Sequence, residues 1–166
     1  MKHKGYYKSP LGRICIEEKD GAIVGLYFVK SMDEKETTEN EITENETIEN
    51  ETIEEAKRQL GEYFSGRRRE FTLPVRLEGT DFQVKVWRAL QTIPYGETRS
   101  YGDIAKQIGN PKAARAIGNA NNKNHILLLV PCHRVIGADG SLVGFESGLD
   151  AKKYLLELEN PKFGKK

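Results

Sequence analysis

The feature that most restricts the fold is a change of pattern near residue 78. Before it, Leu11–Glu17 and Ala22–Val29 alternate like β-strands, and the Asp20-Gly21 pair between them is typical of a hairpin turn. After it, short segments have helical periodicity and begin with capping residues. A chain of 166 residues can form two small domains. We therefore expect an α/β protein with domains at 1–78 and 79–166.

The first domain is also expected to contain one helix. The pattern Thr52-x-x-Glu55 is a capping box, which marks a helix start. The apolar positions that follow fall on one helical face: Ala56, Leu60, Tyr63 and Phe64. Beyond it, Phe71–Val75 is predicted to be a short extended piece at a sheet edge, because Pro74 lacks a backbone donor.

An acidic low-complexity segment at 33–52 interrupts this domain. Asp33 to Glu55 holds eleven acidic residues and one lysine, although the whole chain has a net charge of +1. Its isoleucines fit neither helical nor strand periodicity, which predicts a solvated acidic loop. A regulatory or DNA-mimicking role is the alternative.

The second domain begins with a capping box at Thr80 and Gln83. A further box, Ser100-x-x-Asp103, predicts a helix over Tyr101–Ile108, and Gly109-Asn110-Pro111 then leads into a second helix from Lys112 to Ala120. Two short helices with a tight link fit a helix-turn-helix. Such helix pairs are common, so the pattern leaves DNA binding and a purely structural role equally open.

The second of these helices has an unusual composition. Ala113, Ala114 and Ala116 surround a single long cation, Arg115. Base reading in the major groove requires long polar side chains, whereas small ones let a helix approach a surface closely. The composition indicates shape-driven groove binding.

Cys132 is the candidate nucleophile. The apolar run Ile126–Val130, predicted to be a buried strand, leads directly into Pro131-Cys132-His133-Arg134. Neighbouring cationic groups favour the reactive thiolate. The alternative is a buried, inert cysteine, which is our interpretation of Cys15 on its apolar alternation.

Composition excludes several classes of protein. The longest apolar run has five residues, charged residues make up 31% and mean hydropathy is −0.62, so a membrane protein is not expected. Two cysteines form no disulfide framework, which favours a reducing, cytoplasmic location. Further ligands at zinc-binding spacing are missing, so no metal site is expected.

The chain resembles the O6-alkylguanine-DNA alkyltransferases, also called O6-methylguanine-DNA methyltransferases, from about Gly79 to Glu159. The N-terminal part fits only loosely. The resemblance rests on segments whose order and spacing are specific: Phe82-Gln83-x-x-Val86-Trp87, Ile93-Pro94-Tyr95-Gly96-Glu97-Thr98, Ser100-Tyr101-Gly102-x-Ile104-Ala105, Arg115-Ala116-Ile117-Gly118-x-Ala120-Asn121-x-x-Asn124, Pro131-Cys132-His133-Arg134-Val135-Ile136-Gly137 and Gly144-Phe145-x-x-Gly148-Leu149-x-x-Lys152.

The resemblance implies a ribonuclease H-like N-terminal lobe and a winged-helix-like C-terminal lobe that repairs DNA. Cys132 would take the alkyl group from O6 of a flipped guanine and keep it as a thioether, so each molecule would react once, without a cofactor. His133 would act as the base through a water, oriented by Glu159, and Tyr101 would assist departure of the purine. Asn124 would brace the turn that carries the cysteine.

The resemblance further implies how substrate and DNA are held. Arg115 would fill the space left by the flipped nucleotide, with Ala113, Ala114, Ala116, Tyr101 and Arg134 also at the DNA. The pocket would be lined by Cys132, Val135, Phe145, Glu146, Asn121 and Lys152. The expected partner is double-stranded DNA containing O6-alkylguanine, bound by a monomer that is nucleoid-associated if the host is a prokaryote.

Two departures from the family pattern bear on substrate range. His125 stands where the family usually has proline, and Ser147 where it commonly has glycine. Other functions compatible with parts of the sequence are a non-catalytic alkylguanine-binding protein, a helix-turn-helix regulator and a thiol hydrolase. The first lacks the nucleophile in its known members, and the last two each leave one of the motifs unexplained.

Overall fold

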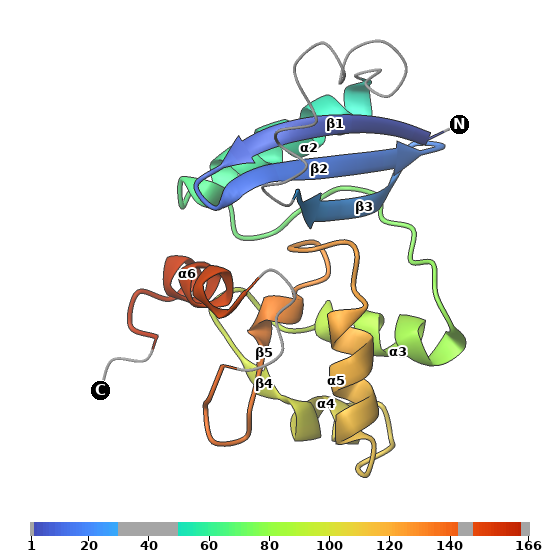
Figure 1. Cartoon of the computed structure of the whole chain (residues 1–166), viewed down its shortest axis with the longest axis vertical. Coiled ribbons are helices and arrows are strands. Elements are labelled where there is room, and N and C mark those ends of the chain that lie inside the picture. The colour runs from blue at the N-terminus through green and yellow to red at the C-terminus, as the bar shows by residue number, and fades with distance from the viewer. Residues whose placement is uncertain (1, 30–49, 143–147, 164–166) are drawn as a thin grey trace. The chain divides into compact units, whose positions relative to one another are not determined.

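The computed structural model describes residues 2–29, 50–142 and 148–163, which form two compact units, Met1–Arg76 and Leu77–Lys166 (Figure 1). Most of the acidic segment 33–52 lies outside the described residues. No helix in the described part of the chain is long and apolar enough to cross a membrane.

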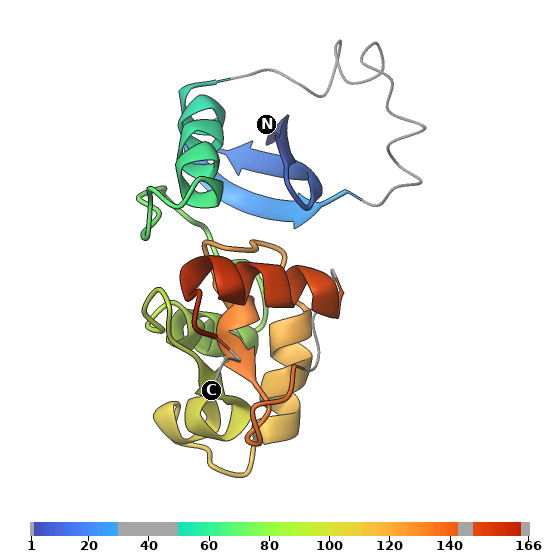
Figure 2. The same cartoon turned by 90° about the vertical axis from the view of Figure 1, so that its left-hand side faces the viewer.

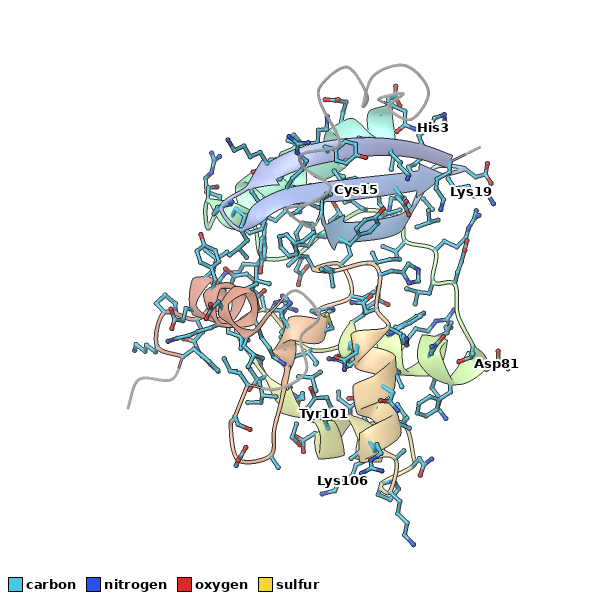
Figure 3. All side chains as sticks on the ribbon, viewed as in Figure 1. His3, Cys15, Lys19, Asp81, Tyr101 and Lys106 are labelled. Atoms are coloured by element: carbon cyan, nitrogen blue, oxygen red, sulfur yellow. The ribbon has the colours of Figure 1, made fainter. Side chains whose placement is uncertain are left out.

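The first unit is built on a three-stranded antiparallel sheet in the order β1-β2-β3. The strands are β1 (Lys2–Ser9), β2 (Gly12–Lys19) and β3 (Ala22–Phe28). The predicted hairpin is confirmed: Asp20 and Gly21 link β2 to β3 with φ of 51° and 84°. Strand β1 was not predicted; its register places Tyr6 opposite Cys15. Cys15 lies in the middle of this sheet (Figure 3).

One face of the sheet is covered by α2 (Glu51–Phe64), as Figures 1 and 2 show. The predicted apolar face is buried, together with Ile53. The predicted cap at Thr52 is wrong. Asn50 caps the helix instead, because its side-chain oxygen accepts from the Ile53 amide at 3.0 Å while its Nδ2 contacts His3 and Glu18.

The predicted extended piece adjoins β3 at the edge of the sheet. Val75 forms a parallel bridge with Ile23, whose amide donates to the Pro74 carbonyl at 2.8 Å. The Ile23 carbonyl in turn accepts from the Arg76 amide at 3.0 Å. This position suits Pro74, because its carbonyl accepts a hydrogen bond while its nitrogen carries no hydrogen that would need a partner.

The second unit is mainly helical. Its elements are α3 (Asp81–Leu90), β4 (Arg99–Ser100), α4 (Tyr101–Gln107), α5 (Ala114–Asn122), the 3₁₀ turn η1 (Cys132–Arg134), β5 (Val135–Ile136) and α6 (Leu149–Glu159). The capping boxes at Thr80 and Ser100 are both present, and β4 pairs with β5 in parallel. Trp87 on α3 holds the end of α5 by donating its indole N–H to the Ala120 carbonyl at 2.9 Å.

The predicted strand at Ile126–Val130 is wrong, although all five side chains are buried. The backbone turns back on itself: the Val130 amide donates to the Ile126 carbonyl at 3.0 Å, and Leu128 adopts φ of 71°. The polar backbone groups of a buried turn need hydrogen-bond partners, because water does not reach them. Asn124 supplies this, because its Nδ2 donates to the Val130 carbonyl at 2.8 Å and its Oδ1 accepts from the Ile126 amide at 2.9 Å.

Candidate active site

Cys132 opens η1 immediately after this buried turn. The residue is 3% exposed and is not in a disulfide. Its amide donates to the Val130 carbonyl at 2.8 Å, so the turn braced by Asn124 sets the position of the thiol. The expected bracing contact of Asn124 is thus present in the structure.

His133 and Glu159 form a buried pair. Nε2 of His133 lies 2.7 Å from Oε2 of Glu159, the last residue of α6, and both side chains are 1% exposed. Arg134 grips the same carboxylate with two N–H groups, Nε to Oε1 at 2.8 Å and Nη2 to Oε2 at 3.0 Å. Its remaining Nη1 donates to the Ile93 carbonyl at 2.7 Å, and its guanidinium lies 5.8 Å from the centre of the Tyr95 ring.

These contacts determine the protonation states. Burial lowers the pKa of His133, and this outweighs the attraction of Glu159, whose charge Arg134 already compensates. Burial alone would raise the pKa of Glu159, but His133 and Arg134 hold it well below its usual value. The pair is therefore a neutral imidazole beside a carboxylate. Nε2–H donates to Glu159, and Nδ1 is the basic nitrogen.

Tyr101 and Lys152 both interact electrostatically with Cys132. Burial raises the pKa of the Tyr101 phenol, and negative charge at Cys132 raises it further, so the hydroxyl keeps its proton. Burial lowers the pKa of Lys152 to about 8, although Cys132 counteracts this. Lys152 is fully buried on α6 and donates to the Val135 carbonyl. That contact was not predicted, and no sequence signal links the two positions.

Asn121, on the last turn of α5, reaches the same main chain. Its Nδ2 donates to the Cys132 carbonyl at 3.4 Å, and the residue is 2% exposed. The carbonyls of Cys132 and Val135 are therefore each held by a side chain from a different helix. The predicted pocket residues Phe145 and Glu146 lie outside the described residues, as does Ser147.

The helix-turn-helix presents the predicted alanines and arginine to solvent. Ala114, Arg115 and Ala116 on α5 are exposed, and Ala113, at its N-cap, is partly exposed. Tyr101 begins α4 (Figure 3), and its ring lies beside Gly118 of α5, where a Cβ would be 3.8 Å from the ring. Tyr101, which interacts electrostatically with Cys132, thus also lies against the exposed helix α5.

The structure shows which contacts Arg134 and His125 make. Arg134 was expected at the DNA, but it is 7% exposed and committed to Glu159 and Ile93, so it holds the carboxylate instead. This contact with a buried acid 25 residues away was not predicted, because no local pattern links the two positions. His125, the departure from proline, packs edge-on against Trp87 with ring centres 5.6 Å apart.

Two family models match the chain. The ribonuclease-like domain of 6-O-methylguanine DNA methyltransferase matches residues 2–77, and the DNA-binding domain matches residues 81–161. The chain belongs to the 6-O-methylguanine DNA methyltransferase family. This confirms the resemblance found in the sequence and the α/β fold class.

Relatives of similar sequence and solved structures of similar fold belong to the same family. The methylated-DNA–protein-cysteine methyltransferase of Methanosarcina acetivorans is 50% identical over 92% of this chain and 95% of its own. The constitutive enzyme of Bacillus subtilis is 46% identical over 96% of each chain. A crystal structure of Mycobacterium tuberculosis O6-methylguanine methyltransferase aligns with a TM-score of 0.82 and 41% identity, covering 100% of this chain and 97% of the other.

A further structure is Mycobacterium tuberculosis OGT in complex with DNA, with a TM-score of 0.82 and 42% identity over 97% of this chain and 93% of that one. The chain is thus a methylated-DNA–protein-cysteine methyltransferase, an enzyme of direct-reversal DNA repair. The non-catalytic and regulatory alternatives are not favoured.

Proposed function

We propose that this family member transfers the O6-alkyl group of guanine in double-stranded DNA to Cys132. The thiolate displaces the alkyl carbon from O6, so a carbon–sulfur bond forms as the carbon–oxygen bond breaks. The observation that carries the proposal is the buried Cys132 followed directly by the His133–Glu159 pair, in the unit that also carries the helix-turn-helix. A thioether is not readily reversed, so each molecule acts once.

His133 removes the thiol proton. Glu159 holds Nε2, so the proton passes to Nδ1 through a water, and the carboxylate stabilises the imidazolium that forms. Arg134 acts as a positioning residue, because its two hydrogen bonds prevent the carboxylate from rotating away.

Tyr101 protonates the leaving guanine. Its raised pKa keeps the hydroxyl protonated at neutral pH, and the purine gains a proton as it departs. Lys152 lies near the sulfur as a cation that favours the thiolate. It also fixes the Val135 carbonyl on the pocket wall.

The DNA is bound through α5. Its exposed alanines allow close approach to the minor groove, and Arg115 occupies the place of the flipped nucleotide. We expect the protein to act as a monomer on cellular DNA in the cytoplasm. It needs no cofactor, because the lesion itself supplies the alkyl group.

Intact-mass measurement after incubation with O6-methylguanine duplex tests this function. We expect a gain of one methylene unit per molecule, mapped to Cys132 by peptide sequencing, with guanine restored in the DNA. Unmodified protein, or a methyl group on another residue, would contradict the proposal.

The pH dependence follows from the buried His133. Burial holds its pKa below the usual value of about 6.5, so the base stays neutral at pH 7, and the single-turnover rate should decline only at a pH below that usual value. The same depression means that acid favours the unfolded chain, in which the usual pKa returns, so stability is lost as the pH falls. A rate that already declines between pH 8 and 7 would mean that Glu159 raises the pKa of His133 instead.

Arg115→Ala should separate nucleotide flipping from chemistry. Flipping costs a few kcal/mol, and the variant loses the side chain that compensates part of this cost. We expect the rate on duplex DNA to fall about tenfold or more, while the rate on free O6-benzylguanine stays close to that of the wild type. Equal losses on the two substrates would instead give Arg115 a role in the fold.

A further inference from the structure

A loop at residues 93–97 contacts Arg134, the residue that holds the Glu159 carboxylate. The Ile93 carbonyl accepts a hydrogen bond from Nη1 of Arg134 at 2.7 Å, and the centre of the Tyr95 ring lies 5.8 Å from the guanidinium carbon. This distance is within the range of a cation–π interaction, which is stronger where water is excluded. Arg134 is 7% exposed, so the loop helps to keep a nearly buried guanidinium in place.

The same loop lies against the C-terminal end of α6. Gly96 adopts φ of 82°, a conformation that favours glycine, and a Cβ there would lie 3.3 Å from the main-chain oxygen of Glu159. The Tyr95 hydroxyl donates to the Leu158 carbonyl at 3.4 Å. That carbonyl is one of the last four of the helix, which have no partner within the helix itself. The loop therefore contacts both the guanidinium and the helix end that carries its carboxylate.

The two contacts of Tyr95 differ in strength. A distance of 3.4 Å is long for a hydrogen bond from a hydroxyl, so the bond to Leu158 is weak. The contact between the ring and the Arg134 guanidinium is the one that bears on the site, because the same guanidinium makes two hydrogen bonds to Glu159.

We infer that Tyr95 is a positioning residue, whose ring keeps the Arg134 guanidinium on the Glu159 carboxylate and so holds the base His133 in its working arrangement. The inference rests on the proposed transfer to Cys132. Tyr95 acts through Arg134, so its removal should alter the behaviour of the base and leave the nucleophile itself present.

The charges around His133 indicate what a displaced guanidinium would change. Burial lowers the pKa of His133, Glu159 on α6 raises it, and the cations Arg134 in η1 and Lys152 on α6 lower it. If the guanidinium moves away from the carboxylate, the charge of Glu159 is less compensated and the pKa of His133 rises. More of the base is then protonated near neutral pH, and the transfer rate declines at a higher pH than in the wild type.

The test compares Tyr95→Met with the wild type on an excess of O6-methylguanine duplex. Methionine is flexible enough to fill the space but has no aromatic face, and Tyr95 is only partly buried, so the variant is expected to fold. We expect the rate constant of methyl transfer to fall about fivefold at pH 7, and the acid limb of the pH–rate profile to move to higher pH. The final fraction of methylated protein, measured by intact mass, should equal that of the wild type.

Two control variants isolate the ring. Tyr95→Phe keeps the aromatic face and loses only the long hydrogen bond to Leu158, so its rate constant should stay within about twofold of the wild type, with the same pH profile. Tyr154→Met removes a tyrosine that is 37% exposed on α6, and it should match the wild type in every measurement.

Three results would overturn the inference. A smaller methylated fraction of Tyr95→Met with the rate constant and pH profile of the wild type would limit Tyr95 to supporting the fold, and unchanged kinetics would make it a spectator. A clear loss of rate with Tyr95→Phe would also exclude the role of the ring, whether or not Tyr95→Met folds. A wild type that gains no methyl group on Cys132 would instead refute the proposed function.

Discussion

Cys132→Ala is expected to abolish alkyl transfer completely. The chain has two cysteines, and Cys132 is the one in the unit that holds the His133–Glu159 pair, so without it the alkyl carbon has no acceptor. The gain of one methylene unit in the intact mass should disappear. Duplex affinity should change less than twofold, because the 3%-exposed thiol makes little contact with phosphates.

Cys15→Ala is the matched control. Cys15 is buried in the sheet of the other unit, and burial raises the pKa of its thiol, so it stays protonated and unreactive. The variant should transfer alkyl groups at the rate of the wild type. Residual demethylation of DNA by Cys132→Ala would show that the acceptor has been wrongly assigned.

Glu159→Ala should both destabilise the protein and stop catalysis. Removing the carboxylate leaves the guanidinium of Arg134 buried without its anion, a change that costs about 3–5 kcal/mol in comparable buried pairs. The free energy of unfolding, measured by urea denaturation, should fall by that amount. Glu159→Gln also lacks the charge but keeps the shape and one acceptor oxygen, so it should lose less stability than Glu159→Ala. Its transfer rate should still drop at least tenfold, because the neutral amide stabilises the imidazolium poorly.

Glu157→Gln provides the comparison on the same helix. Glu157 is exposed and lies 3.9 Å from Lys153, an arrangement that contributes less than about 1 kcal/mol. This variant should match the wild type in both stability and rate. If Glu159→Ala has the same free energy of unfolding as Glu157→Gln, the Arg134–Glu159 pair does not stabilise the site.

Local chemistry explains which predictions from the sequence succeeded. The capping boxes at Thr80 and Ser100 join atoms three residues apart, and the Asp20-Gly21 turn depends on two adjacent backbones. The helix-turn-helix and the hairpin were therefore predictable. Cys132 and His133 are adjacent in the chain, so their proximity needed no tertiary structure.

Other features depend on contacts between distant segments. Thr52 and Asn50 are both residue types that favour the N-cap position. Asn50 caps α2, because β1 and β2 place His3 and Glu18 against its side-chain amide. The run at Ile126–Val130 has the composition of a strand, yet Asn124 satisfies it as a buried turn.

The sequence by itself determined the family, the candidate nucleophile and the two short helices, because each is encoded in neighbouring residues or in motifs of specific order. Only the tertiary structure decided which cation holds the carboxylate. α6 brings Glu159 to η1 across 25 residues, and there burial forces Arg134 to pair with it, since an unpaired charge in the interior is too costly. The same packing placed the side-chain amide of Asn121 against the Cys132 carbonyl.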